Sequence, residues 1–301
     1  MLTIVQAALE AGFLYAPIAL ALFLSFSILN IADMTTDGAF VLGSAVSAMM
    51  CLAGHPILAL PAGMAASAAA GFITAFLQTK LAVPSILAGI VTNIGLYSIN
   101  LMVMGKSNQS LFQTDTIYTM AKDAGFAGSW YEPAVTAIIV LALCALLVLF
   151  LGTRLGLSIR ATGDNADMVR ASSINPNFTI TVGLCVANAM TGLSGAMVAQ
   201  YSTFADVNSG TGMVVLALAA LVIGETLIGK GSMTRRVLGV VAGSIIYRFI
   251  YAAALRFNVP ADYMKLVSAV IVGVAIAAPA VRRWAAFQMQ KRRALAGRRG
   301  E

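Results

Sequence analysis

The chain has 301 residues, of which 59% are hydrophobic and only 10% are charged, and its formal net charge is +7. A soluble domain carries roughly 25% charged residues, so this composition excludes an ordinary soluble protein and indicates a membrane protein. The length fits a single membrane domain over residues 1–301. The three cysteines all lie in apolar runs and there is one histidine, so we expect neither a disulfide framework nor a metal site.

Apolar runs of membrane-spanning length follow one another along the chain. A membrane helix needs about 20 mostly apolar residues, and this length predicts an all-α polytopic membrane protein with about 8–10 transmembrane helices. The first run lacks the basic start of a signal peptide and is longer than its apolar region, so we expect it to stay as a span. The second run is short and could be a half-helix or a re-entrant segment. The predicted spans are 4–29, 38–53, 56–78, 86–104, 133–152, 176–199, 212–229, 237–257 and 263–281.

Basic residues predict the orientation, because they stay on the cytoplasmic side of a membrane. They gather in the loops 153–172 and 230–236 and in the tail 282–301, and alternating spans place all three on one side. The loop 105–132 then faces outward, as does the N-terminus, unless 38–53 is re-entrant. We expect the basic tail to lie in the cytoplasm against anionic lipid of a bacterial inner membrane, so the net charge is no sign of nucleic-acid binding.

Two stretches of the chain resemble each other. Residues 32–38 (ADMTTDG) open one apolar block and residues 205–212 (ADVNSGTG) open another, and each block reaches a Val-Pro pair some 50 residues later. The predicted topology puts Asp33 on the inner side and Asp206 on the outer side. The segments of about 30–104 and 203–281 are therefore predicted to be inverted repeats, with a pathway between them.

Charged and polar residues inside the apolar spans are the candidates for a pathway. Asp33, Asp37, Glu225 and Arg248 are the charged ones, and charge inside a membrane marks a pathway or an interface. The polar break around residues 33–37 could line a pathway or form a short cytoplasmic loop. Glu225 precedes Lys230 by five residues, so an ion pair or a place at the interface competes with a transport role.

Uncharged polar side chains leave a similar choice, since hydrogen bonds between helices explain them as well as a pathway does. The predicted pathway residues are Asp33, Thr35, Asp37, Asn93, Asn188, Gln200, Asp206 and Asn208.

Residues 224–231 (GETLIGKG) nearly match a phosphate-binding P-loop. A P-loop needs Ser or Thr after its lysine and a strand before it, whereas here Gly231 follows Lys230 and a predicted span precedes them. No nucleophile with a neighbouring base stands out elsewhere, and His55 lies alone in a short loop. We therefore expect no enzyme activity, no ATPase site and no cofactor on this chain.

The loop 153–172 alternates charged and apolar residues as a short amphipathic helix does. Asp164 or Asn165 could cap a helical turn that reaches Ala171. Such a helix could dock in a groove of a partner, with Ile159 and Met168 as apolar contacts. It could equally lie on the lipid surface.

The same loop carries a resemblance to a known family. Its pattern of Leu155-Gly156, Arg160-Ala161, Asn165, Met168 and Ala171 before an apolar helix resembles the cytoplasmic coupling segment of permease subunits of bacterial ABC importers. The segments 28–43 and 193–206 are similar to those of the branched-chain amino acid permease group, nearest the putative tryptophan/tyrosine uptake permeases. The resemblance covers residues 15–281. One departure leaves the substrate open: the group's Asn-Phe-Ala-His-Gly-type segment has Asp33, Met34 and Thr35 in place of its His-Gly part.

The resemblance implies a complete importer. Two permease subunits, identical or similar, would form the pathway, two cytoplasmic ATPases carrying ATP and Mg would bind the 153–172 loops, and an external solute-binding protein would deliver the substrate. An amino acid, aromatic ones included, is the implied substrate, with a nucleoside or sugar as the alternative. The implied coupling residues are Gly156, Ile159, Arg160, Ala161, Asp164, Asn165, Met168 and Ala171.

Two other classes remain open from the sequence. A secondary transporter driven by an ion gradient could use the carboxylates of Asp33, Asp37 and Glu225, but it would leave the coupling-type loop without a role. A membrane anchor without a pathway would leave the repeat and the polar breaks unexplained.

Overall fold

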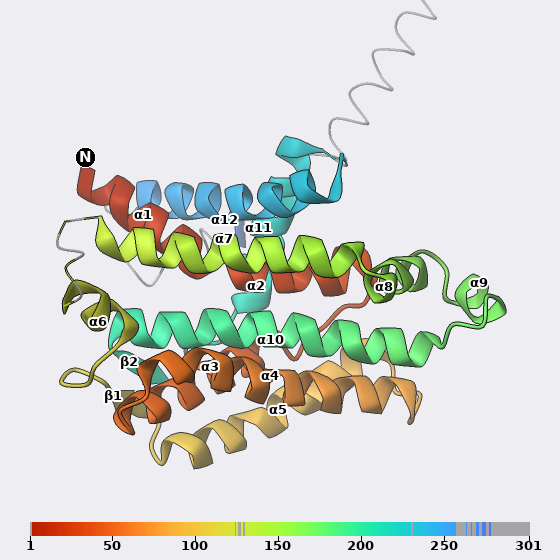
Figure 1. The fold of residues 1–301 in the computed structure, drawn as a ribbon, viewed down its shortest axis with the longest axis horizontal. Coiled ribbons are helices and arrows are strands. Elements are labelled where there is room, and N and C mark those ends of the chain that lie inside the picture. Colours follow the sequence, from red (N-terminus) through yellow and green to blue (C-terminus); the bar gives the residue numbers. More distant parts are fainter. Residues whose placement is uncertain are drawn as a thin grey trace, which may run out of the picture.

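A computed structural model describes residues 2–123, 130–229 and 231–256, with isolated positions at 125, 128 and between 263 and 277. The bundle consists of α1 (Leu2–Leu14), α2 (Ala16–Leu22), the π-helix η1 (Phe23–Ile28), α3 (Thr36–Leu52), α4 (Pro56–Thr79), α5 (Ser85–Met104), α7 (Tyr131–Gly152), α10 (Pro176–Ser202), α11 (Met213–Ile228) and α12 (Met233–Arg256). Of these, α4, α7, α10 and α12 run lengthwise between two ends of the molecule (Figure 1).

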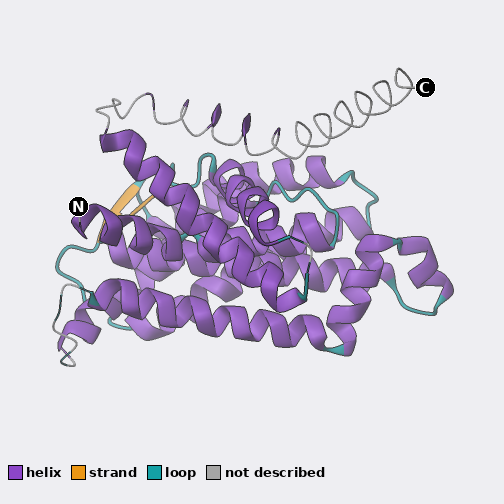
Figure 2. Cartoon of the chain, turned by 90° about the horizontal axis from the view of Figure 1, so that it is seen from above, coloured by secondary structure: helices purple, strands orange, loops and turns teal. Residues whose placement is uncertain are grey.

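Short elements lie at the ends of this bundle. They are β1 (Asn108–Ser110), α6 (Ile117–Asp123), α8 (Arg154–Asp164), α9 (Ala166–Ala171) and β2 (Phe204–Asp206). In the described part of the chain, the only strands are the antiparallel pair β1–β2, which places Asn108 opposite Asp206 (Figure 2).

The predicted all-α polytopic architecture is confirmed. Five helices, α4, α5, α7, α10 and α12, are long and apolar enough to cross a membrane, and the bent pair α1 and α2–η1 is a sixth if it counts as one broken span. The apolar helices α3 and α11 are shorter, with 17 and 16 residues. Eight of the nine predicted spans thus have a counterpart, while 263–281 falls on residues that lie almost entirely outside the described ranges.

The first span is bent, where the sequence predicted one continuous run over 4–29. The chain turns by 40° between α1 and α2. Pro17 lies in the first turn of α2, where a backbone N–H has no partner within the helix, so its absence does not weaken α2. The same missing N–H prevents α1 from continuing through Pro17 as a regular α-helix. The bend is filled by Tyr15, whose ring stacks on Phe40 at 6.2 Å and lies 3.8 Å from the Arg248 guanidinium.

The two ends of the bundle carry different elements. The β1–β2 end holds the strand pair and α6, where the Tyr118 ring meets the Tyr201 ring edge-on at 5.6 Å, and the N-terminus lies there as well (Figure 1). Burial raises the pKa of Tyr118 to about 12, so its hydroxyl stays protonated for its 3.1 Å hydrogen bond with Thr136. The α8–α9 end holds the predicted coupling loop. Gly163 of the predicted inner loop 153–172 and Arg236 of the predicted inner loop 230–236 lie at this same end, because both contact η1.

Helix α10 forms the centre of the bundle, between α3–α4 on one side and α2 on the other (Figure 1). Small residues let these backbones approach closely, as in many membrane helix pairs. A Cβ added to Gly195 would collide with the Phe40 carbonyl, and one added to Gly43 would collide with Gly192. The small residues of the sequence therefore set the spacing of α3 against α10.

Candidate functional site

Helix α3 begins inside the bundle rather than at one of its ends. Ser67, halfway along α4, donates a 2.8 Å hydrogen bond to the Ala39 carbonyl in the first turn of α3. The Asp33 carboxylate, just before α3, meets Asn188 near the middle of α10 at 2.7 Å. At 1.5 Å per residue, α3 covers only about 26 Å, against about 40 Å for α10. Of the two alternatives for the short span, the structure thus shows a half-helix.

The first turns of α3 and α11 are joined by one side chain. The Asp37 carboxylate accepts hydrogen bonds from the backbone N–H of Gly212 at 3.1 Å and of Val214 at 2.9 Å, at the start of α11. These backbone donors have no partner within their own helix, and negative charge is favoured there. Asp37 therefore caps α11 from another helix.

From this joint, α3 and α11 run in opposite directions. The far end of α3 lies at the β1–β2 end, where Gln200 of α10 contacts Ser47. The far end of α11 lies at the α8–α9 end, where Glu225 meets Ser27 of η1. This is the geometry expected of inverted repeats.

The two Ala-Asp segments also fold alike. The Asp33 side chain accepts from the Thr35 N–H at 2.9 Å, and the Asp206 side chain accepts from the Asn208 N–H at 2.6 Å. The backbone carbonyls of both aspartates accept a hydroxyl three residues later, from Thr36 and Ser209 respectively. The sequence similarity thus corresponds to the same local turn before each short helix.

A cavity of about 490 Å³ opens beside the joint, a size typical of small-molecule sites. Asp37 is its only charged lining residue among the described ones. Of the predicted pathway residues, the cavity brings together Asp37, Asn93 and Asn208. Its lining comes from α3, α5 and the segment before α11: Asp37, Gly38, Val41, Asn93, Ile94, Tyr97, Ser98, Asn100, Val207, Asn208, Gly210 and Thr211.

Asn100 is a lining residue that the predicted pathway set lacked. It is 1% exposed, and its side-chain nitrogen donates to the Gly38 carbonyl at 3.2 Å. Its side-chain oxygen has no hydrogen-bond partner among the described residues. A buried acceptor without a donor is costly, so Asn100 is a strained point in the wall of the cavity.

The remaining predicted pathway residues make contacts outside the cavity. Thr35 shares a 2.7 Å hydrogen bond with Thr74, and Asp33 is held by Asn188. Gln200 donates to Ser47 and to the Pro56 carbonyl, and accepts from Ile117. Asp206 lies in β2, at the end of the bundle. Asn188 and Gln200 thus make hydrogen bonds between segments, one of the two roles that the sequence left open for them.

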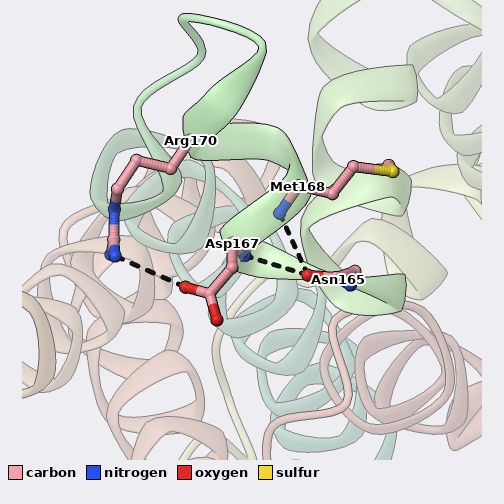
Figure 3. Close-up of polar contacts among 4 residues, drawn as sticks. All are labelled: Asn165, Asp167, Met168 and Arg170. Atoms are coloured by element: carbon pink, nitrogen blue, oxygen red, sulfur yellow. Dashed lines mark hydrogen bonds and ion pairs between the residues drawn. The ribbon is translucent and has the colours of Figure 1, made fainter.

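The predicted coupling loop folds as two short helices, α8 and α9, separated by Asn165. The Asn165 side chain accepts from the N–H groups of Asp167 and Met168, both at 3.0 Å (Figure 3). This cap and the end of α9 at Ala171 agree with the sequence-based prediction. Figure 3 also shows the exposed ion pair of Arg170 with Asp167 at 3.4 Å.

One face of α8 is buried against the bundle. Its inward residues are Gly156, Ile159 and Thr162, and Thr162 shares a 2.8 Å hydrogen bond with Thr179 of α10. Ile159 is 0% exposed, so its predicted role as an apolar contact for a partner is wrong. The helical period of α8 turns this side chain into the core.

The opposite face of α8–α9 is open. Met168 is 55% exposed, as its predicted role requires, and Asp164, Asn165 and Ala171 are exposed as well. Arg160 and Ala161 are half-buried. Leu157, which the sequence prediction left out, is 51% exposed and adds a second apolar side chain to this face.

The P-loop-like stretch is largely helical. Gly224 lies within α11, and a Cβ there would collide with the Gly239 carbonyl of α12. Close helix packing explains this glycine.

The chain is similar to known permease components over most of its length. Residues 4–276 match the family model described as the branched-chain amino acid transport system / permease component. The tyrosine transport system permease protein of Clostridioides difficile (strain R20291) is 32% identical over 256 residues, 84% of each chain. The ribose import permease protein RbsC of Escherichia coli (strain K12) is 26% identical, over 81% of this chain and 75% of its own.

The name of a further relative indicates another kind of solute. The autoinducer 2 import system permease protein LsrC of Yersinia enterocolitica is 26% identical, over 82% of this chain and 66% of its own. No solved structure matches the chain.

Proposed function

We infer the function from family membership: this chain belongs to the permease components of branched-chain amino acid transport systems. It is a membrane-embedded permease of the ATP-binding-cassette importer type. Beyond that, we propose that it forms half of a translocation pathway for a small polar solute, an amino acid with aromatic ones included, and is driven by partner ATPases that hold the ATP and Mg. In this role the chain carries no bond-making chemistry of its own.

The observation that carries the proposal is the pair of short helices α8–α9. A loop that only connected α7 to α10 would need neither the Asn165 cap nor two exposed apolar side chains, Leu157 and Met168. A capped, rigid helix with apolar side chains suits docking in a groove of a partner protein. We assign the partner as the cytoplasmic ATPase, which would place the α8–α9 end and the C-terminal tail in the cytoplasm of a bacterial inner membrane.

Contacts connect the docking segment with the cavity. Thr162 of α8 is bonded to Thr179 of α10, and farther along α10 Asn188 holds Asp33. Asp33 lies just before α3, which carries Asp37 into the cavity. A displacement of α8 would therefore reach the joint of the two half-helices through one continuous helix, which is how we propose that ATP hydrolysis produces alternating access.

The cavity favours an amine-bearing substrate. Its one charged lining residue among those described is the Asp37 carboxylate. Each carboxylate oxygen has two lone pairs, so Asp37 can accept from an ammonium group while it caps α11. An amino acid is thus preferred over a sugar, and the tyrosine permease relative supports the same choice.

We further propose a second permease copy, identical or a close homologue, against α5. The cavity opens on a face where α5 exposes apolar side chains, among them Ile94 at 68% and Met102 at 81%. A cavity that holds the Asp37 carboxylate cannot face lipid without cost. A second copy on this face would cover the cavity and complete the pathway, and an external solute-binding protein would deliver the substrate at the β1–β2 end.

ATP-dependent uptake tests this function. The chain would be reconstituted in proteoliposomes with the ATPase that copurifies with it and with its solute-binding protein, and radiolabelled L-tyrosine would be the probe. We expect uptake that requires ATP, that excess unlabelled amino acid suppresses and that ribose does not. Uptake driven by an ion gradient without ATP would overturn the importer assignment, and suppression by ribose alone would overturn the amino acid assignment.

A further inference from the structure

Three side chains from separate segments meet beside η1. The Ser27 hydroxyl donates to Glu225 Oε1 at 2.6 Å, and Arg236 Nη2 donates to Ser27 Oγ and to the same Glu225 oxygen, each at 2.8 Å. The guanidinium also lies 4.9 Å from the centre of the Phe23 ring. We call Ser27, Glu225 and Arg236 the η1 cluster.

The η1 cluster differs from an ordinary surface ion pair. The Arg236 and Glu225 side chains are only 17% and 22% exposed, whereas those of the Arg170–Asp167 pair are 67% and 92% exposed. Short, charge-assisted hydrogen bonds in a partly desolvated place are stronger than exposed ones. The Arg236–Glu225 pair joins two helices, α11 and α12, whereas the Arg170–Asp167 pair lies within the short helix α9. The η1 cluster therefore ties three segments, η1, α11 and α12, at the α8–α9 end.

On its other side, η1 touches the docking segment. Gly163 of α8 lies against the Ile28 carbonyl so closely that a Cβ at Gly163 would collide with it. A displacement of α8 would therefore act directly on the end of η1, as it would on α10 through the Thr162–Thr179 hydrogen bond. The π-helix is the element between the docking segment and the η1 cluster.

A π-helix can change register. It has i→i+5 hydrogen bonds in place of i→i+4. Short π segments are rare in proteins, and many of those that occur lie at functional sites. Conversion of such a turn to an α-turn rotates the residues beyond it by about 100° around the helix axis. Such a rotation would move Ser27 away from Glu225 and leave the α11–α12 turn free of η1.

We propose that the η1 cluster is a latch: it holds η1 to the α11–α12 turn while the α8–α9 end of the pathway is shut, and it opens when the bound ATPase moves α8. This inference rests on the proposed function, because it needs an ATPase docked on α8–α9. Glu225, Arg236 and Ser27 are then positioning residues, which act on the pathway through η1 without touching the substrate.

Basal ATP hydrolysis of the reconstituted complex tests the latch, since it needs no knowledge of the substrate. The variants are Glu225→Gln and Arg236→Gln, and the matched control is Arg235→Gln, which removes the same charge from a neighbour with no ion pair among the described residues. Without the latch, the ATPase should cycle in the absence of solute-binding protein. We expect basal hydrolysis to rise roughly fivefold or more, the lower range of allosteric coupling, with the control unchanged.

A charge-swapped double variant distinguishes a latch from an ion pair that only stabilises the fold. The double variant Glu225→Arg with Arg236→Glu should return basal hydrolysis toward the unmodified rate. If the single variants fail to reach the membrane, Ser27→Ala, which keeps the ion pair, should still raise basal hydrolysis. Folded variants that hydrolyse ATP at the control rate would overturn the latch alone. An unmodified chain that binds no ATPase would instead overturn the proposed function.

Discussion

Replacing Asp37 with alanine removes the cap that α3 supplies to α11. The lost interactions are the hydrogen bonds from Gly212 N–H at 3.1 Å and Val214 N–H at 2.9 Å. A hydrogen bond to a charged group is worth about 1.5–3 kcal/mol. Because Asp37 is only partly buried, the lower value applies, and the two bonds together contribute about 3 kcal/mol to stability. Asp37→Asn keeps one acceptor oxygen, so it should cost about half as much.

Thermal unfolding of the purified protein in detergent measures this cost. For a large domain 1 kcal/mol corresponds to about 2 °C, so Asp37→Ala should lower the Tm by about 6 °C and Asp37→Asn by about 3 °C. The matched control is Asp167→Ala, which removes a carboxylate that is 92% exposed and should change the Tm by less than about 1 °C. An Asp37→Ala protein as stable as the control would refute the joint between the two half-helices.

Three further changes probe the docking segment. Met168→Glu puts a charge on the exposed apolar face of α8–α9. ATP-dependent uptake should then fall about tenfold or more at equal expression and equal Tm, and unchanged uptake would refute the docking role. Asn165→Ala removes the cap of α9 at a cost of about 1 kcal/mol, and limited proteolysis should then cut between α8 and α9 faster, whereas an unchanged rate would contradict the cap. Gly163→Val leaves no room beside Ile28 and should lower both Tm and uptake, while Gly152→Val, whose Cβ meets nothing, should lower neither; equal effects would contradict tight contact of α8 with η1.

The positions of the helices follow from local sequence. Apolar length predicted a span at 56–78, and α4 is Pro56–Thr79, because an apolar stretch of that length has no other place than the bilayer core. The cap at Asn165 was predictable for the same kind of reason, since Asn bonds the backbone of the next residues whatever surrounds it. The similarity of the Asp33 and Asp206 segments also lay within reach, because each aspartate closes its turn with its own neighbours.

What the sequence could not show depends on partners that are distant in the chain. Glu225 forms an ion pair, one of the alternatives from the sequence, but with Arg236 and beside Ser27; Lys230, the neighbour considered there, lies outside the described residues. Glu10 was not among the charged candidates, yet it is only 4% exposed and accepts a 2.6 Å hydrogen bond from Tyr201, which is 191 residues away. Neither contact has a signature in the local pattern.

The wrong side was assigned to Ile159 for a related reason. An amphipathic helix at a membrane end has an apolar stripe, but the stripe alone does not say whether it faces a partner or the bundle. Two contacts fix the position of α8 against the bundle. Gly156 packs so closely against Leu151 that a Cβ would not fit, and Thr162 is hydrogen-bonded to Thr179. Both turn Ile159 inward.

The central claim is that α8–α9 binds an ATPase, and copurification tests it most directly. The chain, tagged at its C-terminal tail, would be extracted from its native membrane in mild detergent, in parallel with the Met168→Glu variant, and the bound proteins identified by mass spectrometry. The account predicts a soluble ATPase in about equal amount with the unmodified chain, and much less of it with the variant. Recovery of the chain alone, with uptake into vesicles that needs no ATP, would contradict the account and point to an ion-coupled transporter that uses Asp33, Asp37 and Glu225.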